Sequence, residues 1–187
     1  MTKLKGKKIK LGIVGGGSGS WIGHVHRIAA RFDNQYEIVS GVFSRNSKNS
    51  SKFGQSLGID KNRCYSNYKE MANIEAKRTD GIDVVAIMTP PGSHQNIAET
   101  FINKNINIIS DKPFAGNLKQ AKSLFKKIKS NKKIKYALTH NYSAYPMVRE
   151  AKSLVAKGKI GKVNYINVEY IQDWADGNKI TKNNSKN

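Results

Sequence analysis

The sequence predicts an α/β protein built on a doubly wound parallel sheet, with only the start of a second, α+β domain. Three observations support this fold class. Short apolar, β-rich runs alternate with longer amphipathic runs, as in a parallel sheet with crossover helices. A glycine-rich stretch, 15–23, directly follows the first apolar run. A late segment, 163–170, alternates apolar and polar residues and differs from the continuous apolar runs before it.

The expected strands are short apolar runs, each bounded by residues that favour turns. The clearest is 82–88, which lies between Gly81 and Pro90. A run at 106–110 ends at the sequence Asp111-Lys112-Pro113. In chain order, the strands are predicted at 9–14, 36–43, 82–88, 106–110 and 134–139.

Between these strands, apolar residues recur at helical spacing. Residues 22–32 place Ile22, Val25 and Ile28 on one face, and Ser93 is expected to cap a helix that runs to about Lys104. The weakest pattern is 47–57. In chain order, the helices are predicted at 22–32, 47–57, 67–77, 93–104, 118–130 and 147–157. The alternating run 163–170 predicts a strand with one solvated face.

These elements divide the chain into three parts. Residues 1–146 are expected to form the sheet domain, and 147–175 to begin a second domain. Residues 176–187 have no apolar periodicity and are expected to form a disordered tail. A domain-opening strand followed by such a tail indicates a truncated version of a longer protein.

The chain has 187 residues and a formal net charge of +20, which raises nucleic acid or an anionic membrane as partners. However, the basic residues are 27 Lys and only 6 Arg, and they are scattered along the chain. Arg binds phosphate groups and bases better than Lys does. We therefore favour solvated surface charge over nucleic-acid binding. No apolar run reaches the length of a membrane span or an export signal. The single cysteine, Cys64, suggests a reducing compartment, so we expect a cytoplasmic protein.

The glycine-rich stretch lies where a dinucleotide-binding fold has its phosphate loop, between the first strand and the first helix. Glycines let the backbone turn tightly and approach a pyrophosphate, and the helix N-terminus supplies N–H donors. The spacing is unusual because Ser20 stands where the third glycine is expected, and Gly23 follows three residues later. We interpret this as a three-residue insertion. The alternative is a flexible Gly/Ser turn without a ligand.

The end of the second strand bears on the choice of cofactor. Strands of NAD-binding folds end there with an acid that holds the ribose diol. Here the strand continues into Ser44, Arg45 and Asn46, with no acid. Arg45 is therefore a candidate partner for the 2′-phosphate of NADP, against the alternative of an ordinary exposed loop arginine.

Five motifs in register resemble the Gfo/Idh/MocA oxidoreductases over about residues 8–174. They are the glycine stretch through His26, the turn Thr89-Pro90-Pro91-Gly92-Ser93-His94, Asp111-Lys112-Pro113, residues 141–146, and residues 158–163. The resemblance implies an N-terminal Rossmann domain that binds NADP or NAD, and a C-terminal domain that holds substrate and makes homo-oligomer contacts. It also implies hydride transfer between the nicotinamide and a sugar, inositol or related polyol.

Within this resemblance, Asp111-Lys112-Pro113 matches the family's Glu-Lys-Pro, which makes Lys112 the catalytic candidate. An ammonium there would hydrogen-bond the reacting oxygen and stabilise developing negative charge. Thr89 and Pro90 match the turn against the nicotinamide, and His94 is either a cofactor contact or a packing residue. The expected cofactor-binding residues are Gly15, Gly17, Ser18, Gly19, Ser20, Trp21, Ile22, Ser44, Arg45, Thr89, Pro90, His94, Asp111, Lys112 and Asn141.

Two departures from the family leave alternatives open. Ser143 stands where the family often has arginine, and nothing after Trp174 resembles the Asp and His of the second domain. We therefore expect little turnover from the chain alone, and aggregation through the strand at 163–170. The alternative is a nucleotide-binding fragment without catalysis, and a basic nucleic-acid-binding protein is the least favoured class.

Overall fold

The computed structural model describes residues 6–171. It divides into two compact units, Met1–Thr139 and His140–Asn187. The first unit contains the strands β1 Ile9–Gly15, β2 Tyr36–Val42, β3 Val84–Met88, β4 Asn107–Asp111 and β5 Tyr136–Thr139. Its helices are α1 Trp21–Phe32, α2 Ser47–Ser56, α3 Tyr68–Glu75, α4 His94–Ile102 and α5 Leu118–Ser130, with short 3₁₀ turns η1 Lys61–Arg63 and η2 Pro91–Ser93.

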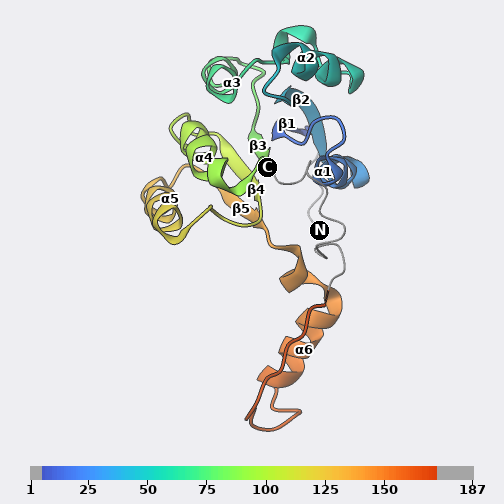
Figure 1. Ribbon diagram of the computed structural model, residues 1–187, viewed down its shortest axis with the longest axis vertical. Helices are drawn as coiled ribbons and strands as arrows, with labels where there is room; N and C mark the ends of the chain where they lie inside the picture. Colours follow the sequence, from blue (N-terminus) through green and yellow to red (C-terminus); the bar gives the residue numbers. More distant parts are fainter. Residues whose placement is uncertain (1–5, 172–187) are drawn as a thin grey trace, which may run out of the picture. The chain divides into compact units, whose positions relative to one another are not determined.

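The five strands form one parallel sheet in the order β2-β1-β3-β4-β5 (Figure 1). The predicted doubly wound sheet is therefore confirmed. One further pairing was not predicted, an isolated parallel bridge between Gly41 of β2 and Cys64. This bridge lies at the outer edge of β2, where a six-stranded dinucleotide-binding sheet has its third strand.

The central strand β3 is buried along its whole length, with apolar side chains on both of its faces, which explains its continuously apolar sequence. Along β3, Val85 and Ile87 pack on one side with Phe101 of α4 and Leu124 of α5. The alternate residues Val84, Ala86 and Met88 pack on the other side, with Ala30 of α1 and the ring of Phe43. The alternation along a single strand places α1 and α4 on opposite faces (Figure 1).

The direction in which the chain moves across the sheet reverses after β2. From β1 it moves outward to β2, and it then returns to β3 on the other side of β1. In open parallel sheets, ligands bind outside the carboxyl ends of the strands at such a switch point. The ends of β1 and β3, at Gly15 and Met88, are therefore where a ligand is expected.

The second unit contains η3 Asn141–Ala144 and α6 Pro146–Ala156. Residues 163–171 follow without assigned secondary structure, so the strand predicted at 163–170 is not formed among the described residues. A strand requires a ladder partner. In this exposed segment the ring centroid of Tyr170 lies 6.1 Å from that of Tyr142. The predicted tail, 176–187, and Trp174 lie outside the described residues.

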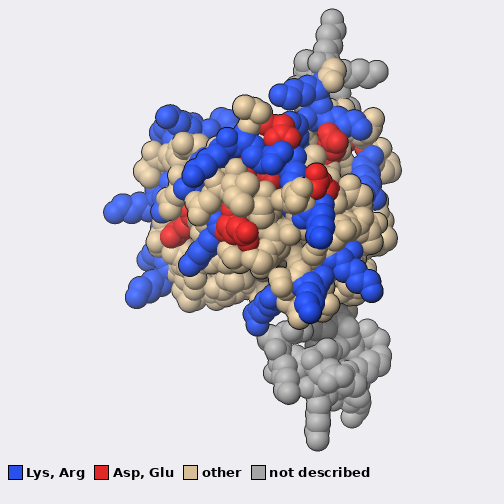
Figure 2. Space-filling model, turned by 90° about the horizontal axis from the view of Figure 1, so that it is seen from above, with Lys and Arg blue, Asp and Glu red and all other residues tan. Residues whose placement is uncertain are grey.

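Basic side chains are distributed over the first unit's surface. Figure 2 shows Lys and Arg across the visible face with acidic groups among them. No helix of residues 6–171 is long and apolar enough to span a membrane.

Candidate functional site

The glycine loop joins β1 to α1 at the switch point. Gly15 has a φ of +89°, and a side chain there would place Cβ 2.6 Å from the carbonyl oxygen of Met88. Gly23 lies in the first turns of α1, where a Cβ would come within 2.3 Å of the carbonyl oxygen of Gly16. Gly23 therefore allows the close approach of loop and helix that the third glycine of this motif provides, which is consistent with a three-residue insertion.

The start of α1 is arranged as an anion site. Ser20 caps the helix, and its Oγ accepts a hydrogen bond of 3.1 Å from the backbone N–H of Gly23. Ser18 and Gly19 are exposed just before the cap, and no hydrogen bond of the described residues is donated by their backbone N–H groups. Free N–H groups beside a helix N-terminus are suited to a phosphate. The loop therefore fits the diphosphate of a dinucleotide.

The next two predicted residues lie in the first turn of α1. Trp21 is 77% exposed, whereas Ile22 is half-buried against the cluster that includes Leu11 and Ile13. The side chain of Ile22 therefore contributes to packing.

Arg27, a residue that the sequence analysis did not single out, holds the backbone of the glycine loop in place. The Arg27 Nη1 of α1 donates a 2.6 Å hydrogen bond to the carbonyl oxygen of Gly16. Its guanidinium lies 5.2 Å from the ring centroid of Phe53 in α2, a cation–π distance. Burial, and secondarily the nearby Arg31, lowers the pKa of Arg27 below its usual range. Arg27 thus connects the loop, α1 and α2.

A cleft of about 470 Å³ opens at the carboxyl ends of β1, β2 and β3. Five predicted residues line it, namely Gly15, Ser44, Arg45, Thr89 and Pro90. Sequence reasoning missed the wall formed by Ser66, Asn67 and Tyr68 at the start of α3. The available signal was the capping pattern there, since Asn67 Oδ1 accepts from Glu70 N and Glu70 reaches back to Ser66.

The turn after β3 is held by its own side chains. The Ser93 hydroxyl lies 2.8 Å from Thr89 Oγ1 and 2.7 Å from the carbonyl oxygen of Pro90. Ser93 occupies the expected N-cap position of α4, but its side chain makes no capping bond and bonds back into the turn instead. His94 is buried beneath this turn, with 1% of its surface exposed.

The turn after β4 carries the candidate catalytic lysine. Lys112 is exposed, and its backbone N–H donates to Asp111 Oδ1 at 2.8 Å. The same Asp111 oxygen accepts a 3.0 Å bond from the Thr139 hydroxyl. Burial lowers the pKa of the nearby His26, and the negative charge of Asp111 opposes this shift. Asp111 is thus a fixed carboxylate that orders the lysine's backbone.

The remaining predicted residues do not line the 470 Å³ cleft. They are Gly17, Ser18, Gly19, Ser20, Trp21, Ile22, His94, Asp111, Lys112 and Asn141. Asn141 belongs to the second unit, where its amide donates to the Tyr145 hydroxyl at 3.3 Å. The structure therefore brings Gly15, Arg45 and the Thr89 turn together at one cleft of the first unit, whereas Asn141 belongs to the second unit.

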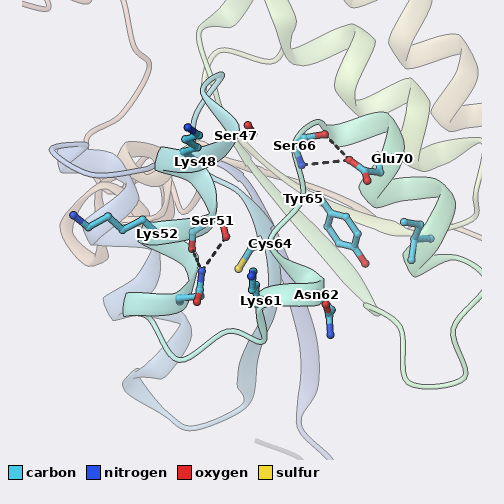
Figure 3. Close-up of a pocket in the computed structure, with 12 residues that line it drawn as sticks. Ser47, Lys48, Ser51, Lys52, Lys61, Asn62, Cys64, Tyr65, Ser66 and Glu70 are labelled. Atoms are coloured by element: carbon cyan, nitrogen blue, oxygen red, sulfur yellow. Dashed lines mark hydrogen bonds between the residues drawn. The ribbon is translucent and has the colours of Figure 1, made fainter.

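A second hollow of about 610 Å³ lies between α2, η1 and α3 (Figure 3). Lys48, Lys52 and Lys61 line it together with Cys64. Burial, and secondarily Asp60, raises the pKa of the Cys64 thiol, which disfavours the reactive thiolate. Among residues 6–171, no group of three or more His, Cys, Asp or Glu side chains is placed to hold a metal ion.

A doubly wound parallel sheet with a glycine loop at its switch point defines a dinucleotide-binding Rossmann unit. Residues 9–140 match the model of the oxidoreductase family with an NAD-binding Rossmann fold, GFO_IDH_MocA. The chain belongs to this Gfo/Idh/MocA family, as its motifs predicted.

Similar proteins support this assignment. An uncharacterized oxidoreductase, YfiI of Bacillus subtilis, is 32% identical over 96% of this chain and 46% of its own length. An oxidoreductase structure from Sinorhizobium meliloti has 46% identity and a TM-score of 0.78, covering 83% of this chain and 43% of that one. An inositol dehydrogenase homologue from Azotobacter vinelandii, solved with NADH and myo-inositol, has 31% identity and a TM-score of 0.79, covering 83% and 41%. The chain thus spans less than half the length of these relatives.

Proposed function

We propose that the first unit binds the cofactor of an oxidoreductase across the cleft at the ends of β2, β1 and β3. One observation carries this proposal: the glycine loop and the capped α1 terminus lie at the switch point beside the 470 Å³ cleft. In this arrangement the diphosphate lies over the loop, the adenosine ribose beside Ser44 and Arg45, and the nicotinamide toward Thr89 and Pro90.

The reaction we propose is hydride transfer between the nicotinamide and a CH–OH carbon of a polyol, sugar or inositol. The bound nicotinamide would supply the hydride chemistry. The homologue solved with NADH and myo-inositol supports this substrate class. Lys112 stands at the end of β4, and an ammonium there stabilises negative charge on the substrate oxygen and helps to relay its proton. The second domain that the resemblance implies would orient the substrate and make oligomer contacts, in a soluble cytoplasmic enzyme.

The test of cofactor binding is a titration of the folded chain with NADH and NADPH, followed by nicotinamide fluorescence. We expect saturable binding. A folded sample that shows none up to millimolar cofactor would contradict the proposed site. Binding that is normal in a Lys112→Ala variant, together with loss of polyol oxidation by the full enzyme, would support the catalytic role of the lysine.

A further inference from the structure

The His94 ring connects the two turns that surround the proposed nicotinamide position. His94 is the first residue of α4 and its side chain is buried. Its Nε2 lies 2.7 Å from the carbonyl oxygen of Thr89, and its Nδ1 lies 2.8 Å from the carbonyl oxygen of Pro113. One carbonyl belongs to the turn after β3, and the other directly follows Lys112. A single rigid ring therefore spans the cleft wall and the lysine turn.

The strand order indicates which half of the cofactor these turns face. Ser44 and Arg45 follow β2, on one side of β1, and they would hold the adenosine ribose. β3 and β4 lie on the other side of β1, so the nicotinamide half extends toward Thr89 and the lysine turn. This assignment rests on the function proposed above.

We propose that His94 is a positioning residue that sets the distance between the nicotinamide wall at Thr89 and the lysine turn at Lys112. Both ring nitrogens are occupied by backbone carbonyls, so the ring has no free nitrogen for cofactor or substrate. A carbonyl oxygen only accepts hydrogen bonds. A neutral imidazole has a single N–H and donates to one of the two carbonyl oxygens, and only a doubly protonated ring donates to both. Without this buried ring, the turn after β3 and the turn after β4 would lose their common partner.

The test compares two ligands that share the adenosine diphosphate part. NADH carries the nicotinamide, whereas ADP-ribose lacks it. Each is titrated into the 187-residue chain and two variants, His94→Leu, which removes both ring nitrogens, and His94→Gln, whose amide keeps an N–H donor at this position. For His94→Leu, we expect NADH binding to weaken about tenfold, the equivalent of about one lost hydrogen bond, and ADP-ribose binding by less than about twofold. His94→Gln is expected to recover most of the NADH affinity.

A matched control perturbs the other half of the cleft. The Ser50 hydroxyl is also buried and bridges two backbone groups, accepting from Phe43 N at 2.9 Å and donating to the carbonyl oxygen of Tyr65 at 3.2 Å. Because Phe43 lines the adenosine side, Ser50→Ala is expected to weaken NADH and ADP-ribose equally. A substitution that only destabilises the fold, at either site, would weaken the binding of NADH and of ADP-ribose by the same factor.

Equal weakening of both ligands in His94→Leu, or no weakening, overturns the positioning role. If that variant does not fold, the wild-type chain decides: NADH should shift the ¹⁵N NMR signals of the His94 ring, and ADP-ribose should leave them in place. Identical signals with the two ligands also overturn the proposal. A wild-type chain that binds neither ligand refutes the proposed cofactor site instead, so the two failures are distinguishable.

Discussion

The two compact units of this chain differ sharply in what they bury. In Met1–Thr139, strands and helices enclose two apolar clusters on the two faces of the sheet. In His140–Asn187, no described side chain is buried, and Tyr165, Val168 and Ile171 are among the most exposed apolar residues. Both units nevertheless contain a helix whose apolar residues recur at helical spacing in the sequence.

The helices α5 and α6 make the comparison concrete. Both are amphipathic, yet α5 buries Leu124 completely and α6 buries no residue. Helices in proteins owe most of their stability to the packing of their apolar face. The periodic pattern thus predicts where a helix forms, but it does not tell what covers that helix. The predictions below test this difference between the two units, from the largest expected effect to the smallest.

The largest effect is expected from removing a core side chain of the first unit. Phe101 of α4 is fully buried, and Phe101→Ala should lower the free energy of unfolding by about 3–5 kcal/mol. The matched change in the second unit, Met147→Ala at a residue 77% exposed, should stay within about 0.5 kcal/mol. Urea unfolding of both variants measures the two changes in the free energy of unfolding. A similar decrease in both variants would contradict the difference between the two units.

The next effect concerns the buried ion pair that supports the α3 wall of the cleft. Glu75 accepts from Arg63 at 2.5 Å and 3.0 Å, and also from the Tyr65 hydroxyl and Ile82 N. Glu75→Gln leaves the Arg63 charge buried, and we expect a loss of about 3 kcal/mol, the lower end for a broken buried pair, because Asp80 remains 3.6 Å away.

The exposed Glu70 on the same helix provides the control for this pair. Glu70→Gln is expected to change the unfolding free energy by less than about 0.5 kcal/mol. The Glu75 carboxylate also holds the Tyr65 hydroxyl, whose pKa is raised by burial and by this hydrogen bond. A Glu75→Gln variant as stable as wild type would show that the pair is not part of the first unit's core.

The first unit could be predicted from the sequence because its elements follow regular periods. The helix 118–130 agrees with α5 at both ends, and the expected strands overlap all five observed ones. The bridge at Cys64 was missed because a single paired residue has no period. The strand at 163–170 was expected from alternation alone, but a ladder also depends on a partner segment, which alternation does not reveal.

The candidate site was predicted less completely. The loop was visible because the close approach of Gly23 to Gly16 requires glycine, which is directly readable in the sequence. The role of His94 as a bridge between two turns could not be predicted from the sequence. Its partners are backbone carbonyls five and nineteen residues away, and any residue type supplies a carbonyl.

A smaller effect is expected on ligand selectivity in the first unit. Arg45 lines the cleft where the strand β2 ends without an acid. If it contacts a 2′-phosphate, Arg45→Ala should weaken NADPH by about 1.5–3 kcal/mol, as for a charge-assisted hydrogen bond, and NADH much less. Fluorescence titration of both cofactors measures the difference. The exposed Arg149 of the second unit is the control, and equal weakening of NADPH and NADH in Arg45→Ala would contradict the assignment.

The smallest effect is a pH dependence confined to the first unit. His26 lines an apolar cavity of about 200 Å³ beside Ile13 and Met88, and burial lowers its pKa below the ordinary 6.5. Its folded pKa therefore lies below its unfolded pKa. Above pH 6.5 neither state binds the proton, and the stability is fully present. As the pH falls through that value, the unfolded state takes up a proton first, so the folded state is progressively disfavoured.

The measurement is the urea midpoint of wild type and of His26→Gln between pH 7.5 and pH 5.5, values chosen on either side of the ordinary histidine pKa of about 6.5. Wild type should lose stability toward the acid end, and His26→Gln should lose less, because glutamine does not titrate. Asp111, which faces His26 and attracts its proton, reduces the effect without reversing it, since burial is the larger cause. His140→Gln, at an exposed histidine of the second unit, should retain the wild-type slope. The opposite result would be a urea midpoint that no longer depends on pH in His140→Gln but still does in His26→Gln. The pH dependence of stability would then come from the second unit, and the contrast between the two units would fail.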